Sequence, residues 1–223
     1  MPHQTFFALA GMGLLLLTAC VPSLPITPSP SIQRPAAALQ RIPATVAVVV
    51  ERAFVDSRFE RHVSGEPGSS VKIDIGESSL ESVKVVLAHV FETVGLVASA
   101  ADATGFDFIV YPKIISSYSQ YDSPYGDVLA VIAYTFTFVR QADQQVVQTL
   151  EVSGVGQHAR STVFVVPDFL LAISTLGSWD GTSRAMTVSR AFALAQERAF
   201  SALMSQLPTS VVATEAERLR NRR

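Results

Sequence analysis

The sequence contains one cysteine, four histidines and few charged residues, and each shortage excludes a class of protein. One cysteine cannot form a disulfide within the chain, which excludes a disulfide-stapled scaffold. The histidines beyond the first residues, His62, His89 and His158, lie outside metal-ligand spacing of one another and of acidic clusters. Charged residues make up 16% of the chain and sum to −2, so the composition does not indicate nucleic acid as a partner.

Catalytic motifs are missing as well. The chain has no Gly-x-Ser-x-Gly motif, no phosphate-binding P-loop and no His-Glu-x-x-His sequence. Gly154 and Gly156 fall in a strand pattern, where a bulge or a close backbone approach is the ordinary reason for glycine. Asp122 and Asp127 flank a turn and are typical turn formers. We therefore expect no catalytic residues, no metal and no cofactor, and we expect that the protein is not an enzyme.

Long hydrophobic runs are scarce, although 48% of the residues are hydrophobic and the mean hydropathy is +0.33. The longest uninterrupted apolar run, Phe6 to Ala19, has about fourteen residues, fewer than the ~20 that a membrane-spanning helix requires. This length is typical of the apolar region of a secretion signal, although the residues before it lack the usual Lys or Arg. We predict a signal peptide over residues 1–19.

The apolar run ends in Leu17-Thr18-Ala19-Cys20, which resembles the lipobox of bacterial lipoproteins. The resemblance implies that signal peptidase II recognises Leu17, Thr18 and Ala19 and cuts before Cys20. It also implies a diacylglyceryl group on the Cys20 thiol and a fatty acid, such as palmitate, on the new amino group. Several acyl chains attach a protein to a bilayer effectively permanently. Val21 stands where an Asp would retain a lipoprotein in the inner membrane, so the sorting rule implies the outer membrane, on its periplasmic face.

Proline dominates the segment that follows Cys20. Residues 21–43 are rich in proline, which disfavours helix and sheet and favours extended polyproline II conformation. We expect residues 20–43, the lipidated cysteine included, to form an unstructured tether that holds the body up to ~70 Å from the bilayer. A single domain then occupies residues 44–208, and a flexible basic tail follows over 209–223.

Within the domain, hydrophobic periodicity predicts both strands and helices. Strands are expected over 45–50, 71–75, 106–119, 127–140 and 146–156, and helices from about 78 to 94 and from 183 to 207. Gly95 is expected to end the first helix. The predicted fold class is α+β: an antiparallel sheet with a long central hairpin and two amphipathic helices packed on one face.

This order of elements is similar to that of CsgG-like or YajG-like envelope lipoproteins, and also to that of the auxiliary lipoproteins of ABC-type lipid transport systems. The first resemblance implies a structural or assembly component of the cell envelope that works through protein contacts. The second implies an accessory lipoprotein that binds a lipid or another apolar ligand. A filled core with an exposed apolar patch favours the first, and an internal cavity favours the second.

Two segments are candidate contact surfaces. Tyr121 and Tyr125 lie in the expected hairpin turn, where aromatic side chains favour contact with a partner, although local turn packing is the alternative. The stretch 164–176, with Phe169 and Leu170, carries one charged residue and is either buried or an interface. The expected partners are the lipid bilayer, through acylated Cys20, and an envelope protein or a second copy of the chain, with no nucleic acid.

Overall fold

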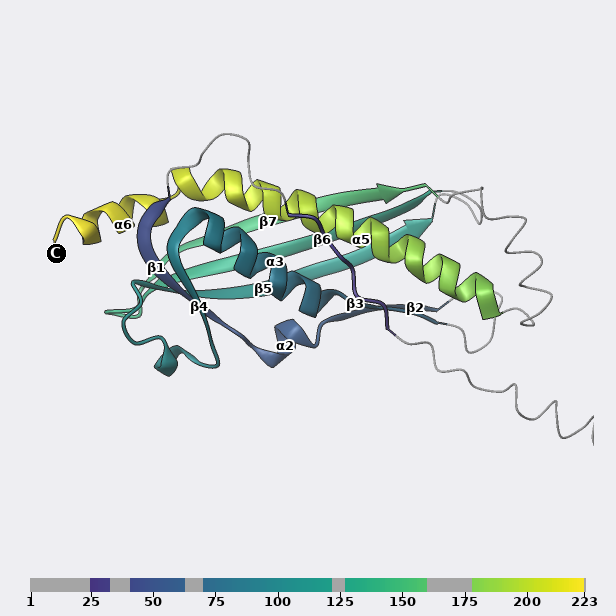
Figure 1. Ribbon diagram of the computed structural model, residues 1–223, viewed down its shortest axis with the longest axis horizontal. Coiled ribbons are helices and arrows are strands. Elements are labelled where there is room, and N and C mark those ends of the chain that lie inside the picture. The colour runs from purple at the N-terminus through teal and green to yellow at the C-terminus, as the bar shows by residue number, and fades with distance from the viewer. Residues whose placement is uncertain (1–24, 33–40, 63–69, 122–126, 160–177, 223) are drawn as a thin grey trace, which may run out of the picture.

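The computed structural model describes residues 25–32, 41–62, 70–121, 127–159 and 178–222 (Figure 1). The elements in chain order are β1 (Ile42–Val49), α2 (Arg52–Val55), β2 (Arg58–His62), β3 (Ser70–Asp74), α3 (Ile75–Val90), β4 (Phe91–Val97), the 3-10 turn η2 (Ala100–Asp102), β5 (Phe108–Tyr121), β6 (Val128–Arg140), β7 (Val146–His158), α5 (Ser178–Gln206), the 3-10 turn η4 (Leu207–Thr209) and α6 (Val211–Arg220).

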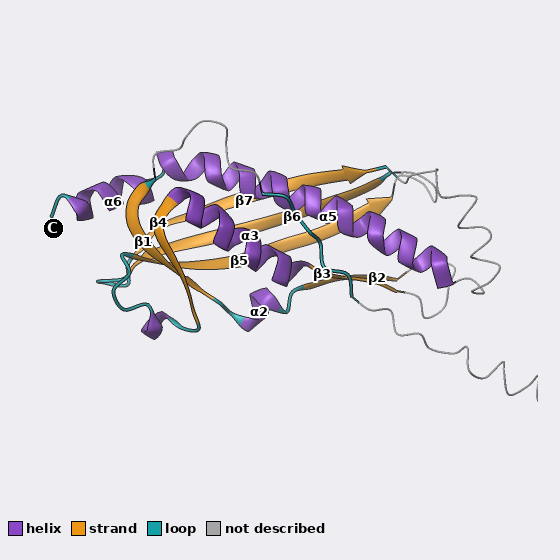
Figure 2. Ribbon diagram, viewed as in Figure 1, coloured by secondary structure: helices purple, strands orange, loops and turns teal. Residues whose placement is uncertain are grey.

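Five strands form one mixed sheet in the order β4-β1-β5-β6-β7, and β2 pairs with β3 in a separate antiparallel ribbon (Figure 2). β1 runs parallel to both β4 and β5, whereas β5, β6 and β7 are antiparallel neighbours. The α+β class is confirmed, but the expectation of a wholly antiparallel sheet is wrong. Helix α3 returns the chain along the sheet, so β4 enters it parallel to β1. Hydrophobic periodicity reports which face of a strand is buried and carries no information on strand direction.

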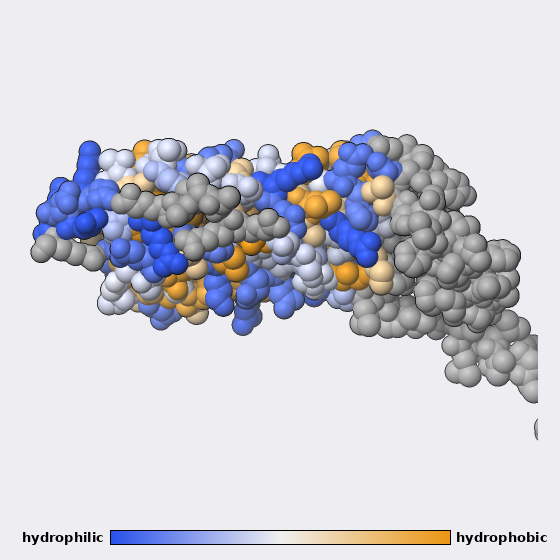
Figure 3. Space-filling view, turned by 45° about the horizontal axis from the view of Figure 1, so that its top comes forward, coloured by the Kyte–Doolittle hydropathy of each residue, from blue (hydrophilic) through white to orange (hydrophobic). Residues whose placement is uncertain are grey.

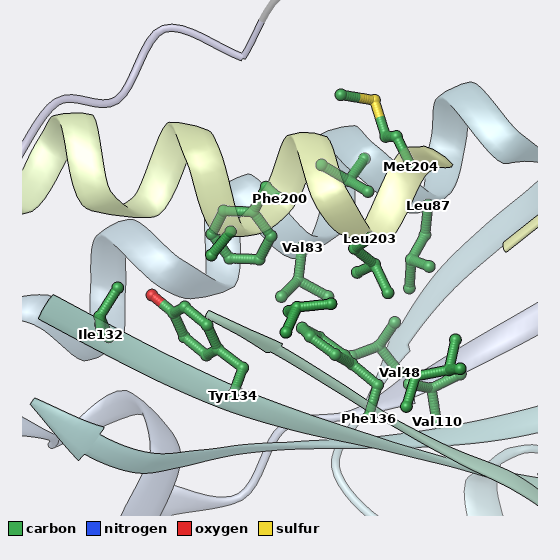
Figure 4. Close-up of a cluster of buried hydrophobic side chains, with 14 of the residues drawn as sticks. Val48, Val83, Leu87, Val110, Ile132, Tyr134, Phe136, Phe200, Leu203 and Met204 are labelled. Carbon is green, nitrogen blue, oxygen red and sulfur yellow. The ribbon is translucent and has the colours of Figure 1, made fainter. Parts of the chain in front are cut away.

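The main core lies between one face of the sheet and the helices α3 and α5. Its largest fully buried side chains include Tyr134, Phe136 and Phe138 of β6, which alternate with half-buried neighbours. Phe200 of α5 packs on Tyr134 and Phe136, with ring centroids 5.0 and 6.3 Å apart. Figure 4 shows the facing contributions of sheet and helices: Val48, Val110, Ile132, Tyr134 and Phe136 below, Val83, Leu87, Phe200, Leu203 and Met204 above.

The opposite face of the sheet carries a much smaller core. Five buried residues lie there beneath η2: Ala47, Val49, Ala103, Ile109 and Val139. These residues belong to β1, to the start of β5 and to the end of β6, and Ala103 directly follows η2. On this face the small core lies at one end of the sheet, where β5 begins and β6 ends.

Helix α5 lies very close to β7 because two glycines leave room for its backbone. A Cβ atom at Gly154 would lie 1.9 Å from the carbonyl oxygen of Ala195, and one at Gly156 would lie 1.9 Å from that of Ala191. Real Cβ atoms do not approach backbone oxygens this closely. Close backbone approach is therefore the reason for both glycines, as the strand pattern indicated.

The expected boundary between the first long helix and the strand after it is wrong. Helix α3 ends at Val90, and Gly95 lies inside β4, paired with Ala47 of β1. The residues from Phe91 onward are apolar or β-branched often enough to form an edge strand, and pairing with β1 decides in favour of the strand. A helical spacing of apolar residues cannot distinguish these outcomes over one turn.

The C-terminal residues also differ from the expected flexible tail. Residues 211–220 form helix α6, whose first turn is capped by the Ser210 side chain accepting from the Ala213 N–H. Val212 and Ala216 are buried against the main core. Arg140 of β6 forms an ion pair with Glu215 at 3.1 Å. The Arg and Glu residues of this segment lie mostly on the exposed face of an amphipathic helix. Figure 3 shows hydrophilic residues gathered at this end of the molecule.

Candidate functional site

Residues 25–32 form an N-terminal strap that is docked on the body. The Ile26 N–H donates to the Lys72 carbonyl at 3.1 Å, and the Asp74 N–H donates to the Ile26 carbonyl at 3.1 Å. These two bonds make a parallel bridge between Ile26 and Ile73 of β3. Figure 1 shows the strap, in purple, running from β3 toward α5 on the helix-covered side. Over these residues the expectation of an unstructured tether is wrong.

The other end of the strap is held by α5. The Ser31 N–H donates to a side-chain oxygen of Glu197 at 2.6 Å. Ile26 and Ile32 pack against the main core, and Pro28 between them is buried. The strap resembles the expected polyproline segment in its composition, yet two isoleucines spaced six residues apart give it an apolar side. Those isoleucines are the sequence signal that could have predicted docking.

An open groove of about 480 Å³ lies between the strap and the first turns of α3. Its lining combines strap residues with one side of the helix: Thr27, Pro28, Ser29, Pro30, Ile32, Glu77, Ser78, Glu81, Ser82 and Val85. The two serine hydroxyls that α3 contributes to the lining are already bonded, since Ser82 donates to the Ser78 carbonyl at 2.8 Å and Ser78 to the Ile75 carbonyl at 3.1 Å. The groove therefore offers apolar walls and two carboxylates, and it offers no nucleophile or base in a catalytic arrangement.

A buried polar network connects α3, α5 and β6 behind the groove. The Gln196 amide donates to the hydroxyls of Ser78 and Ser79, both at 2.9 Å, and Ser79 is 2.8 Å from the Tyr134 hydroxyl. Gln196, Ser79 and Tyr134 are fully buried. Buried polar groups of this kind are retained when they are bonded to one another, and here they determine how the two helices seat on the sheet.

Burial raises the pKa of the Tyr134 phenol well above its ordinary value, and hydrogen bonds to Ser79 and Gln196 offset this only in part. The hydroxyl is therefore protonated at any physiological pH. A protonated phenol bonded within the core is a structural group, so Tyr134 provides no general base.

Among the described residues, no helix is long and apolar enough to cross a membrane. In the same part of the chain, no three His, Cys, Asp or Glu side chains are grouped so that they could hold a metal ion.

The residues predicted from the sequence to form sites lie largely outside the described ranges. This is the case for Cys20 with Leu17, Thr18 and Ala19, for Tyr125, and for Phe169 and Leu170. Tyr121 is the last residue of β5, and its backbone is paired with Val128, the first residue of β6. Of the predicted turn, the structure thus describes only the two strand ends that flank it.

The docked strap is the feature that sequence reasoning missed.

Comparison with known proteins gives a fold but no family. No protein-family profile matches the chain, and no curated protein matches its sequence. A DUF330 protein from Xanthomonas campestris is similar in structure, with a TM-score of 0.52 and 13% identity over 88% of this chain and 99% of that chain. The two chains share a fold. At this identity the likeness does not extend to function.

Two other solved structures are more distant. A hypothetical protein from Chlamydia trachomatis has a TM-score of 0.44 and 12% identity, over 77% of this chain and 99% of its own. A lipoprotein from Neisseria meningitidis has a TM-score of 0.33 and 14% identity, over 60% of this chain and 97% of its own. The solved structures that resemble this chain thus include a DUF330 protein and a bacterial lipoprotein.

Proposed function

We propose that the protein is a lipoprotein of the bacterial outer membrane that faces the periplasm and works as a structural or assembly component of the envelope. The observation that carries the proposal is Leu17-Thr18-Ala19-Cys20 at the end of an apolar run. The docked strap supports it, because the body holds the chain only a few residues after Cys20. A non-enzymatic role agrees with the buried polar groups, which bond to one another.

The first test concerns the anchor. Metabolic labelling with palmitate should mark the wild-type protein, and Cys20→Ser should abolish the label and release soluble or unprocessed protein. Separation of inner and outer membranes should place the labelled protein with the outer membrane. A palmitate label that persists on the Ser variant would end the lipoprotein proposal.

Contact with an envelope partner is tested at the turn between β5 and β6. Tyr121 and Tyr125 offer rigid aromatic area at small entropic cost, which is typical of interface anchors. Replacing both by Ser should leave folding and acylation intact and weaken the recovery of cross-linked envelope proteins. A double variant that retains every cross-link would show that the turn is not the contact surface, and one that unfolds would show that the tyrosines belong to the core.

The second candidate function is that of an accessory lipoprotein of an ABC-type lipid transport system. The groove between the strap and α3 favours it, because proline, isoleucine and valine side chains line a volume large enough for part of an acyl chain. Mass spectrometry of lipids that copurify with the detergent-extracted protein tests this candidate. Val85→Asp would place a charge in the groove and should reduce such lipid, whereas Ala88→Asp, an exposed position of the same helix outside the lining, is the matched control.

A further inference from the structure

The direction of the strap determines where the chain leaves the body toward Cys20. The strap is parallel to β3 and meets it at Ile73, so the N-terminal end of the strap, at Pro25, points toward the start of β3. Residues 20–24 separate the proposed acylation site from the strap, and five peptide steps reach roughly 17 Å at full extension. Acylation of Cys20 would therefore hold the body near the bilayer instead of at the end of a long tether.

The start of β3 lies at the same end of the molecule as the end of β5. Val71 of β3 is paired with Arg61 of β2, and the Arg61 guanidinium donates to the Ser119 carbonyl of β5 at 2.6 Å. Ser119 is in turn paired with Ala130, close to the start of β6. The end of the sheet where β5 ends and β6 begins is therefore the end toward which the N-terminal end of the strap points.

At this end, an exposed apolar row lies on the face of the sheet that none of the described helices covers. Tyr118, Val131 and Val155 are direct partners across β5, β6 and β7. Val131 lies between the buried Ala130 and Ile132, so the row is on the face that points away from α3 and α5. Tyr118 and Val155 are 46% and 42% exposed, although both strands are otherwise well packed on their inner face.

We propose that Tyr118, Val131 and Val155 form a lipid-facing row, which the short distance between the docked strap and Cys20 brings to the interfacial layer of the bilayer. This inference rests on the proposed lipid anchor. A tyrosine beside aliphatic side chains is the composition that the bilayer interface favours, with the ring in the headgroup layer and the aliphatic groups below it. The short distance to Cys20 favours the bilayer over a second copy of the chain as the occupant, because the anchor holds this end at the membrane surface.

The chain offers a matched pair of positions for the experiment. Val155 and Val146 are both exposed valines of β7, at 42% and 62%, and nine residues of strand place them about 30 Å apart. The chain contains one cysteine, so with Cys20 acylated a cysteine introduced at either position is the sole free thiol. Val155→Cys and Val146→Cys are labelled with a fluorophore in the lipidated protein, which is reconstituted into phosphatidylcholine vesicles. Quenching by headgroup-nitroxide phosphatidylcholine is then measured.

We expect several-fold stronger quenching of the label at position 155 than at position 146. Acylation of Cys20 is verified first by mass spectrometry of the purified protein. A missing acyl group overturns the lipoprotein proposal itself, whereas acylated protein with equal quenching at both positions overturns only the lipid-facing row. Concentration-dependent protection of position 155 in detergent, with equal quenching in vesicles, would assign the row to a second copy instead.

The strap is tested in the same assay. Ile26→Asp removes the apolar contact that seats the strap, and Pro25→Asp changes an exposed strap residue outside the groove lining as its control. With the strap released, the tether lengthens, and quenching at position 155 should fall toward the value at position 146. The thermal unfolding midpoint of each variant shows whether the body is intact, and an intact Ile26→Asp protein with unchanged quenching would overturn the role of the strap.

Discussion

The two faces of β6 are made from adjacent residues of one strand and have opposite roles. Toward the helices, Ala130, Ile132, Tyr134, Phe136 and Phe138 are completely buried. On the other face, the residues between them stay half-buried. Three of the five inner side chains, Tyr134, Phe136 and Phe138, are aromatic, whereas the outer ones between them are valine, alanine and threonine.

This difference means that one face of β6 stabilises the fold, whereas the other face is available for contact with other molecules. Burial of large apolar side chains provides most of the favourable free energy of folding, so the inner face determines whether the domain folds. The outer face contributes less and tolerates changes, so it is available to contact other molecules. Three substitution pairs test this comparison, beginning with the largest expected effect.

Phe136→Ala should cost about 3–5 kcal/mol of unfolding free energy, because it leaves a cavity in the centre of the main core. Thr135→Ala, on the opposite face of the same strand, should change the free energy by less than about 1 kcal/mol. Chemical denaturation of the two variants measures both values. Equal small effects would mean that the strand does not have the two distinct faces described above.

Gly154→Ala should cost about 1–3 kcal/mol, because the new methyl group would overlap the Ala195 carbonyl and force α5 away from β7. Ser153→Ala is its control, since Ser153 is exposed on the other face of β7 and removal of its hydroxyl should hardly change the free energy of unfolding. Thermal unfolding of the pair gives the comparison. A Gly154→Ala protein as stable as the wild type would show that α5 can move without loss of packing.

Tyr134→Phe should cost about 0.5–1.5 kcal/mol, because it removes the hydrogen bond to Ser79 while preserving the ring contacts with Phe136 and Phe200. Tyr111→Phe, on the opposite face of the sheet, is the control and should have a smaller effect. Denaturation at neutral pH measures both. An equal loss of unfolding free energy in the two variants would show that the hydrogen bond in the buried network adds no extra stability.

The same tyrosine predicts a pH dependence. Burial raises the pKa of Tyr134 in the folded protein, whereas the unfolded chain has the ordinary pKa of 10.0. Above that pH the unfolded state binds fewer protons than the folded state, so stability should fall as the pH rises. Below pH 10 the phenol is protonated in both states, so it does not make the stability depend on pH. The Tyr134→Phe variant should therefore lose stability less steeply above pH 10 than the wild type.

Sequence periodicity placed the strands well, because each strand buries one face. The strand expected over 127–140 is β6, and those expected over 71–75 and 146–156 correspond to β3 and β7. Pattern reasoning failed where a tertiary contact decides the outcome. Gly95 has a local context that suits a helix end, but pairing with Ala47 places it in a strand.

The candidate site shows the same limit. The proposed anchor at Cys20 could be predicted from the sequence, because a lipobox is a local motif whose recognition requires no fold. The strap was not predicted, because prolines suggest a free spacer and its docking depends on Ile73 of β3 and Glu197 of α5. These partners are 47 and 166 residues away along the chain: Ile73 from Ile26, and Glu197 from Ser31.

The sequence by itself determined the properties that depend on local chemistry. These are the proposed anchor at Cys20, the alternation of buried residues along β6 and the presence of small residues at Gly154 and Gly156. The tertiary structure alone decided the parallel pairing of β1, the seating of α6 and the path of the strap. The physical reason is that side-chain periodicity records how much of each residue is buried, whereas strand direction and docking depend on hydrogen bonds between distant segments.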